Sequence, residues 1–497
     1  MHWGALFRQP AQKNSYEKPS LHGRNIASSQ RKEISEMYDL ILKNGSVVTP
    51  GGIVKTDIAV KNGRIAGLGD FSSAKKIIDC KNLHILPGVI DTHVHFREPG
   101  LTHKEDLATG TLSAIAGGVT TIFDMPNTDP PTITAETLQD KMTRAKGRAW
   151  CDYAFFIGGS PQNVASLATL EMMPGCPGVK IFMGSAKGDL LVAEDSVFLS
   201  LLKNGTRLVA LHAEDEPRAK ERRHIAEESH NAGDHPVWRD EEMALMATKR
   251  AVRLAREAGR RIHVLHVTSA EEIAFLQDHK DIATIEVTPH HLTLFAPDCY
   301  DRLGAYATTN PPIRDKRHQD ALWEAVRNGL VDVLGSGHPP HTREEKDKPY
   351  PDAPNGVPGV QTTLPIMLDH VNKGHLTLEH LVDLLSHNPQ RLFQIARKGR
   401  IAVGYDADFA IVDLNKTQTI TNKWIKSKCG WTPYDGIKVT GWVEGTVLGG
   451  DLVMWKDNIL GSPKGKSVVF AETLRSSAET ALPSSNPLQK QGLQNSI

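Results

Sequence analysis

Four histidines stand where predicted strands end, and together they have the composition of a metal site. His93 and His95 are two residues apart in "DTHVHFREPG", so on a strand both side chains point to the same side. His212 ends a strand in "ALHAED", and His266 ends another in "LHVTS". Imidazole nitrogens are ordinary ligands of zinc and other divalent metals. A single HxH pair is common by chance, so the prediction depends on all four histidines.

Lys180 is a lone lysine inside the apolar strand "GVKIFMG". A buried ammonium is costly, and the ordinary alternatives are a snorkelling or an ion-paired side chain. Because the expected position shares a rim with the four histidines, we predict a neutral amine that reacts with carbon dioxide to form a carbamate. Its two oxygens can bridge two divalent metal ions, which then share a hydroxide and polarise a carbonyl oxygen. This chemistry suits amide hydrolysis, with zinc as the preferred metal and manganese or cobalt as substitutes.

An α/β alternation predicts the elements that position these side chains. Between residues 87 and 397, apolar strands alternate with helix-compatible segments such as "EEMALMATKRAVRLAREAG". The first of eight expected strands is "VIDTHVH" and the last is "VDVLGSGH". This pattern predicts a (β/α)8 TIM barrel. Most of the strands carry a polar or ionisable residue at the C-terminal end, which is the rim where this fold places active sites.

The segments on either side of the barrel have the pattern of short β-strands. Residues 37–86 and 398–458 are expected to pair into one small β-sandwich domain, with the barrel inserted into it. The dipeptides Asn44-Gly45 and Asn62-Gly63 lie between apolar runs and predict tight hairpins.

Composition is typical of a soluble globular enzyme. The chain has 497 residues, a formal net charge of zero and 39% hydrophobic residues, so nothing indicates a nucleic-acid surface. No apolar run reaches the length of a membrane span. Five scattered cysteines without a CxxC pair favour a reducing, cytoplasmic compartment. Residues 1–36 lack the apolar core of a secretory signal, and they and residues 475–497 are predicted to be disordered.

Seven motifs resemble the dihydroorotases of the amidohydrolase superfamily, from about Tyr38 to Trp455. They are "DTHVHFREPG", "DMPNTDPPT", "GVKIFMGS", "LHAED", "VTPHHL", "NPPIR" and "GVPGVQTTLP". Members of that family reversibly hydrolyse the cyclic amide of dihydroorotate to N-carbamoyl-aspartate in pyrimidine synthesis. The resemblance implies that the metals are bound by His93, His95, carboxylated Lys180, His212 and His266.

The same resemblance implies a site for a substrate carboxylate, made by Arg97, Asn127 and His341. Arginine presents planar paired donors that match a carboxylate. The similar allantoinases and hydantoinases generally lack an arginine after the HxH pair, so Arg97 favours an anionic cyclic ureide. The structural alternative is a surface ion pair between Arg97 and Glu98 or Glu105.

Position 337 departs from the family pattern. The family has S-D-H-A-P-H where this chain has "SGHPPH", so Gly337 replaces an aspartate. By the resemblance, that aspartate binds one metal and acts as general base and acid, a role that contributes about 10²–10⁴-fold. Asp332 is expected on the opposite face of the strand, and His338 faces away from the site if the strand is regular. Glu344 and Glu345 follow in a loop, and the catalytic residue is left unassigned.

Two further histidines, His290 and His291, follow the seventh expected strand in "VTPHHL". One of them can line the pocket, and stacking or core roles are equally compatible with the sequence.

Three functions follow from these residues. The first is a dihydroorotase with impaired or relocated proton transfer. The second is a catalytically inactive dihydroorotase-like partner of aspartate carbamoyltransferase. The third is a hydrolase of another cyclic amide, such as allantoin or a hydantoin, with a different proton shuttle. The five other predicted metal ligands are all present, which favours an enzyme, and a homodimer is expected by analogy.

Overall fold

A computed structural model describes residues 37–186 and 188–471. The disorder predicted for residues 1–36 and 475–497 concerns positions outside these ranges.

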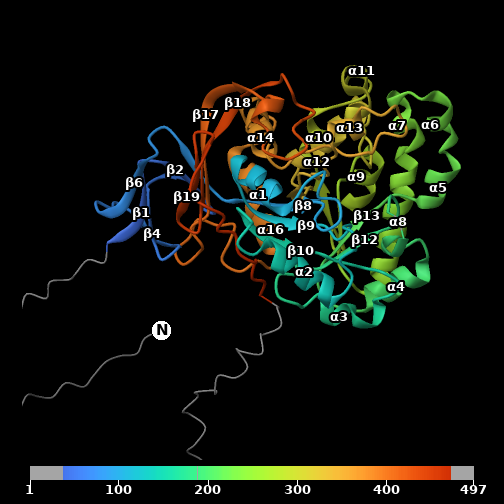
Figure 1. Ribbon diagram of the computed structural model, residues 1–497, viewed down its shortest axis with the longest axis horizontal. Coiled ribbons are helices and arrows are strands. Elements are labelled where there is room, and N and C mark those ends of the chain that lie inside the picture. Colours follow the sequence, from blue (N-terminus) through green and yellow to red (C-terminus); the bar gives the residue numbers. More distant parts are fainter. Residues whose placement is uncertain (1–36, 187, 472–497) are drawn as a thin grey trace, which may run out of the picture. The chain divides into compact units, whose positions relative to one another are not determined.

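Parallel strands form the predicted TIM barrel (Figure 1). They pair in chain order, and a parallel bridge between Val94 and His338 joins the first strand to the last. The backbone N–H of His95 also donates to the carbonyl of His338 at 2.8 Å. The strands are β8 (Val89–Val94), β9 (Val119–Asp124), β10 (Asp152–Phe155) continued by β11 (Ile157–Gly158), β12 (Val179–Phe182), β13 (Val209–His212), β14 (Ile262–Val264), β15 (Ala283–Val287) and β16 (Val333–Leu334). All eight strands predicted from the sequence are present.

Helices follow the barrel strands and cover them (Figure 1). In the longest, α8, the side chain of Asp240 accepts from the backbone N–H of Met243, and Gly259 ends the helix with φ 68°. Ala251 and Ala255 belong to its buried face, one helical turn apart. The helices are α1 (Leu107–Ala116), α2 (Ala135–Ala145), α3 (Leu167–Leu170), α4 (Asp195–Lys203), α5 (Glu216–Glu221), α6 (His224–Ser229), α7 (His235–Trp238), α8 (Glu241–Ala258), α9 (Ala270–Gln277), α10 (Pro289–Thr293), α11 (Asp298–Leu303), α12 (Lys316–Arg327), α13 (Arg343–Lys346), α14 (Thr363–Asn372), α15 (Leu378–Val382) and α16 (Asn388–Leu392).

Strands from before and after the barrel form two sheets, β5-β4-β1-β6 and β20-β19-β18-β17-β7-β2-β3. In Figure 1 the blue strands β1 and β2 lie beside the orange-red β17 and β19. Leu42 and Ile58 of one sheet share a buried cluster with Ile85 and Phe409 of the other. The strands are β1 (Tyr38–Lys43), β2 (Ser46–Thr49), β3 (Gly52–Lys55), β4 (Asp57–Lys61), β5 (Arg64–Gly69), β6 (Ala74–Asp79), β7 (His84–Pro87), β17 (Phe409–Thr419), β18 (Lys438–Leu448), β19 (Asp451–Trp455) and β20 (Asn458–Ile459). The predicted pairing across the barrel insertion is therefore found, while the exact domain boundaries stay predictions.

The two predicted hairpin turns have different outcomes. Asn62-Gly63, with φ 51° and 73°, joins the antiparallel strands β4 and β5 as a hairpin turn does. The prediction for Asn44-Gly45 is wrong, because β1 and β2 belong to different sheets and do not pair. The turn instead carries the chain from one sheet to the other. A Cβ atom on Gly45 would lie 2.5 Å from Cδ1 of Ile85, so this corner needs glycine for close packing.

Residues 466–470, near the end of the described chain, pack against the barrel. This contact was not predicted from the sequence. The backbone N–H of Tyr153 donates to the carbonyl of Lys466, and that of Val468 donates to the carbonyl of Tyr153, both at 3.0 Å. Phe470 then packs in a buried cluster with Phe393 and barrel side chains. The segment that follows the β-sandwich thus adds to the barrel.

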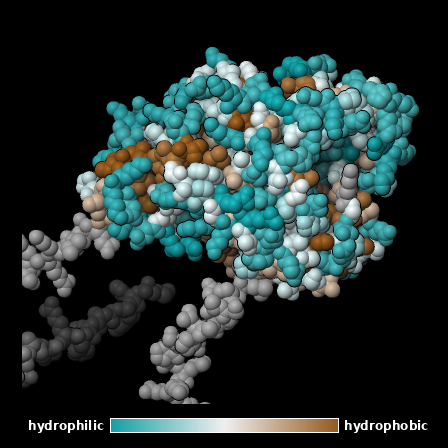
Figure 2. Space-filling view, viewed as in Figure 1, coloured by the Kyte–Doolittle hydropathy of each residue, from teal (hydrophilic) through white to brown (hydrophobic). Residues whose placement is uncertain are grey.

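The visible surface is mostly hydrophilic, and its most prominent hydrophobic patch lies over the β-sandwich (Figure 2). Exposed apolar side chains on these strands include Ile53 and Val54 of β3 and Ile77 of β6. Within the described ranges, no helix combines the length and the apolarity needed to cross a bilayer.

Candidate functional site

All eight site residues predicted from the sequence line one cavity of about 830 Å³. Three barrel strands show how the fold achieves this. His93 lies in β8, Lys180 lies in β12, and His212 is the last residue of β13. The C-terminal ends of parallel strands meet at one end of a barrel, so residues far apart in sequence become neighbours. The eight residues are His93, His95, Arg97, Asn127, Lys180, His212, His266 and His341.

Buried carboxylates orient two of the histidines. Nδ1 of His93 lies 2.7 Å from Oε1 of Glu286, and Nε2 of His212 lies 2.7 Å from Oε2 of Glu214. Against the effect of burial, Arg239 and His212 hold the pKa of Glu214 well below its ordinary value, and His93 acts likewise on the pKa of Glu286. Ionised carboxylates only accept hydrogen bonds, so each histidine donates from that nitrogen and keeps a lone pair on the other. Metal-binding histidines are oriented in this way.

The other two histidines complete the donor set. Nδ1 of His95 lies 2.6 Å from Oδ1 of Asn127, which leaves the lone pair of this ring on Nε2. Nε2 of His266 and Nδ1 of His212 face each other at 3.0 Å. Two nitrogens bound to one zinc ion lie about 3.3 Å apart, given tetrahedral geometry and bonds of about 2.0–2.1 Å. The pair is thus close to the spacing that a shared ion requires.

Lys180 has the surroundings expected of a neutral amine. Its side chain is buried, and Nζ lies 4.6 Å from the centre of the Phe182 ring. Burial lowers the pKa of Lys180 to about 7, with Glu286 opposing the shift. The amine makes no hydrogen bond or ion pair with the rest of the described chain. The snorkelling and ion-paired alternatives are therefore not observed.

The types of donor atom in this cavity suit a pair of divalent metal ions, although the side chains are not yet arranged around a common point. Residues 37–186 and 188–471 contain no three histidine, cysteine, aspartate or glutamate side chains that already converge on one point. The fit lies in the lone pairs left on Nε2 of His93 and His95, in the facing nitrogens of His212 and His266, and in an unpaired amine. The metal ligands and the carboxylation of Lys180 stay predictions.

Arg97 is a buried cation without an acidic partner. Only 7% of its surface is exposed, and its backbone has φ 63°, which residues other than glycine seldom adopt. Nε donates to the carbonyl of Pro340 at 3.2 Å, and one terminal nitrogen lies 3.2 Å from Nε2 of His341. Burial lowers the pKa of this guanidinium to about 10. Within the described ranges no carboxylate lies within 4.0 Å of it.

The ion pair proposed as the structural alternative for Arg97 is wrong. Glu98 accepts from Arg148 at 2.7 and 3.2 Å. Glu105 is buried and accepts from the hydroxyl of Ser427. Both acids are therefore satisfied elsewhere, and the guanidinium remains directed to the cavity that it lines.

His341 is held in place by residues distant in sequence. Nδ1 lies 3.1 Å from Nζ of Lys104, and Nε2 lies 3.2 Å from the carbonyl of Asn355. The indole of Trp431 donates to the backbone carbonyl of His341 at 2.7 Å. These contacts fix the orientation of the ring beside Arg97 at the cavity.

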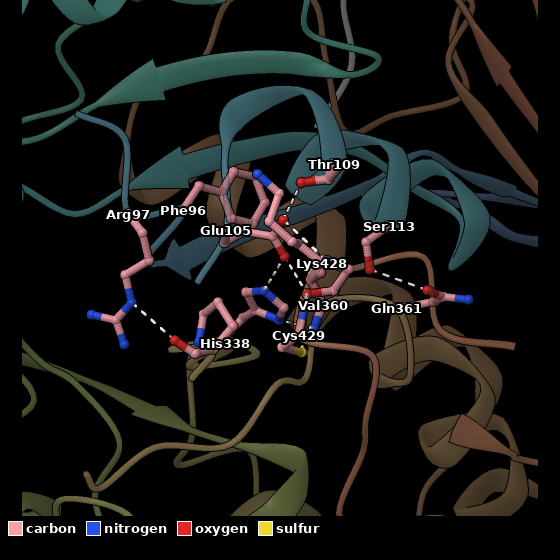
Figure 3. A network of polar contacts seen from close by, with 12 residues as sticks. Phe96, Arg97, Glu105, Thr109, Ser113, His338, Val360, Gln361, Lys428 and Cys429 are labelled. Atoms are coloured by element: carbon pink, nitrogen blue, oxygen red, sulfur yellow. Dashed lines mark hydrogen bonds and ion pairs between the residues drawn. The ribbon is translucent and has the colours of Figure 1, made fainter. Parts of the chain in front are cut away.

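His338 lies among Phe96, Glu105 and Val360 (Figure 3) and is not part of the cavity lining, in agreement with the prediction that it faces away from the site. Its Nδ1 accepts from the backbone N–H of Gly359 at 3.0 Å, and its Nε2 lies 3.7 Å from Oε2 of Glu105. The ring also meets Phe96 edge-on at 5.5 Å. His338 therefore supports the strand end from behind, and its carbonyl holds His95 in position.

The acids near position 337 do not replace the missing aspartate. Asp332 pairs with Lys280 and accepts from the backbone N–H of Ile285. Glu345 pairs with Lys104 at 2.9 Å. The acidic residues among the described cavity lining are Asp129 and Asp189, and both are exposed.

Two functional residues escaped the sequence analysis, namely Glu286 and Glu214. Glu286 is a lone acid in the apolar strand "ATIEV", the same signal that singled out Lys180. Glu214 follows His212 at a spacing of two, but its contact with Arg239 joins distant segments and has no local signal.

Comparison with known proteins places the chain in a family. The Amidohydrolase family matches residues 84–453. The chain belongs to this family. The N-terminal domain of the urease alpha-subunit also matches, over residues 22–89. The predicted resemblance and the barrel fold are thereby confirmed.

Individual relatives include enzymes with different cyclic substrates. A dihydroorotase of Methanosarcina acetivorans is 34% identical over 443 residues, covering 86% of this chain and 94% of the relative. An allantoinase of Deinococcus radiodurans is 34% identical over 448 residues, covering 86% and 98%. The solved L-hydantoinase (dihydropyrimidinase) from Arthrobacter aurescens has a TM-score of 0.83 at 31% identity, covering 87% and 100%. These relatives are thus named for different cyclic amides, and their identities to this chain do not separate the substrates.

Proposed function

We propose that the protein is a metal-dependent dihydroorotase. It would catalyse the reversible hydrolysis of the cyclic amide of (S)-dihydroorotate to N-carbamoyl-L-aspartate in pyrimidine synthesis. The observation that carries this proposal is the buried, unpaired guanidinium of Arg97 in the cavity of the four histidines and Lys180. A buried cation is costly unless an anion joins it, and a carboxylate on the substrate is such an anion.

The histidines and Lys180 are the proposed holders of two divalent metal ions, most readily zinc. Once bound, the ions supply Lewis-acid polarisation of the scissile carbonyl and activation of water. The proposed ligands are His93, His95, His212, His266 and the carbamate of Lys180.

The remaining cavity residues orient the substrate. Arg97 offers paired donors to the carboxylate, and His341 lies beside it in the lining of the cavity. The amide oxygen of Asn127 is taken by His95, so its NH₂ group is the part left for the substrate. With the carboxylate fixed at one side of the cavity, the cyclic amide lies toward the histidines and Lys180. Such positioning can supply a large part of the rate acceleration.

Two alternatives have support of their own. The similarity to an allantoinase favours another cyclic amide as the substrate. The absence of an acid at Gly337 favours an inactive protein, for example one that associates with aspartate carbamoyltransferase.

A substrate panel with the zinc-loaded protein tests the proposal. We expect turnover of dihydroorotate, with allantoin and hydantoin at least about 100-fold lower in kcat/KM, because neither offers a ring carboxylate to Arg97. Preferential turnover of allantoin or hydantoin would contradict the proposed substrate. No turnover of any of the three, with a stable complex with aspartate carbamoyltransferase in gel filtration, would support the inactive partner.

A further inference from the structure

The space beside Gly337 is open toward another potential proton carrier. Gly337 has φ 58°, and a Cβ atom built on it would lie 3.4 Å from Cγ2 of Thr288 and 3.5 Å from Cε1 of His290. These are ordinary van der Waals distances, so the space admits a side chain, although a φ of 58° strains residues other than glycine. An acid at position 337 would therefore extend beside the imidazole of His290.

His290 differs from its neighbour His291 in having no hydrogen-bond partner among the described residues. Nδ1 of His291 lies 2.7 Å from Oγ1 of Thr288, and its Nε2 lies 3.1 Å from the carbonyl of Pro311. His291 is thus engaged at both nitrogens and holds the start of α10. His290 is 3% exposed, lines the cavity, and contacts the ring of His291 at a centroid distance of 4.3 Å. Because no hydrogen bond to the described chain engages either nitrogen of His290, the ring is available to a group that enters the cavity.

We infer that His290 transfers the proton during the hydrolysis, in place of an acid at position 337. This inference rests on the proposed function. The imidazole takes a proton from the attacking water as the new C–O bond forms at the amide carbon. The resulting imidazolium gives the proton to the ring nitrogen as the C–N bond breaks, which restores the neutral imidazole. Burial lowers the pKa of His290 well below its ordinary value, so the ring is neutral when the substrate binds.

Four proteins test the inference as a double-mutant cycle: the protein itself, His290→Gln, Gly337→Asp and the double variant. Aspartate and asparagine enter the left-handed backbone region more readily than most residues, so Gly337→Asn is a matched control without an acid. Dihydroorotate turnover is measured with each zinc-loaded protein. Zinc content and the calorimetric affinity for N-carbamoyl-aspartate are measured beside it, to separate proton transfer from metal and ligand binding.

We expect His290→Gln to lower kcat by about 10²–10⁴-fold, with zinc content retained and affinity changed less than about threefold. When Gly337→Asp is added to His290→Gln, kcat should rise at least about tenfold above that of His290→Gln alone. Gly337→Asn added in the same way should give no rise. This recovery would identify the two positions as alternative carriers of one proton.

Several results would overturn the inference. One is a kcat of His290→Gln within threefold of that of the protein itself. Another is that His290→Gln lowers kcat by the same factor whether position 337 is glycine or aspartate. Turnover by Gly337→Asp alone would reject His290 as the carrier yet support a dihydroorotase site. If neither the protein itself nor Gly337→Asp turns over dihydroorotate, the proposed function fails, and this inference fails with it.

Discussion

Replacing Arg97 by methionine separates substrate binding from fold stability. The guanidinium is buried and has no acidic partner among the described residues, so a substrate carboxylate is its proposed counter-ion. A hydrogen bond to a charged group contributes about 1.5–3 kcal/mol. Two such bonds, at 1.36 kcal/mol per factor of ten, give a loss of about 10²–10⁴-fold in kcat/KM for dihydroorotate. Dihydrouracil, the same ring without the carboxylate, should lose much less.

The effect on stability has a different expected size. Removing one member of a buried ion pair costs about 3–5 kcal/mol, because the other charge is left unpaired. Arg97→Met strands no carboxylate, and only its charged hydrogen bond to the carbonyl of Pro340, about 1.5–3 kcal/mol, is lost. Removal of a buried cation offsets part of this loss, so the free energy of unfolding should fall by less than it does for a broken ion pair. Arg260→Met is the matched control, because Arg260 is equally buried but pairs with Glu171. In urea denaturation, Arg260→Met should show the loss of about 3–5 kcal/mol expected for a broken ion pair.

The combination of both assays refutes or supports the account of Arg97. If Arg97→Met were as destabilising as Arg260→Met, and if the ratio of kcat/KM for dihydroorotate and dihydrouracil stayed unchanged, Arg97 would be a structural residue. We predict that Arg97→Met keeps its fold while the ratio of kcat/KM for dihydroorotate to that for dihydrouracil falls strongly.

The remaining predictions concern two buried lysines. Lys180→Arg cannot form the carbamate, so zinc content should fall and the ¹³C signal obtained after labelling with bicarbonate should disappear; retained zinc and turnover would contradict the carbamate. Lys398 pairs with Asp152 and Asp408, and Lys398→Met should cost about 3–5 kcal/mol in chemical denaturation, against about 1 kcal/mol or less for the exposed Lys464→Met. Burial raises the pKa of Asp152. Lys398 opposes this rise, so Lys398→Met should raise the pKa of Asp152 in the folded state further. A carboxyl whose folded pKa exceeds its unfolded value loses stability as pH rises, so the deficit of Lys398→Met should be larger at pH 8 than at pH 5, and an equal deficit would contradict this.

The barrel and its rim could be predicted because their signals are local. An apolar strand, a polar residue at its end and a following helix repeat along the chain, and a spacing of two places His93 and His95 on one face. The same logic finds Lys180. These features need only nearby residues and the known geometry of parallel strands.

Other features depend on contacts between distant segments, which local patterns do not encode. Trp431 reaches the carbonyl of His341, and Lys466 pairs with Tyr153. Asn44-Gly45 has the composition of a hairpin but turns between two sheets, since the composition of a turn does not determine which strands pair afterwards. The opening beside Gly337 likewise becomes informative only when His290 is seen next to it.

The central claim is that the cavity recognises a cyclic amide bearing a carboxylate. Its most direct test is the ratio of kcat/KM for dihydroorotate and dihydrouracil with the zinc-loaded protein. The account predicts a ratio of about 10² or more, because only dihydroorotate can pair with the guanidinium of Arg97. A ratio near one, or a preference for dihydrouracil, would contradict it.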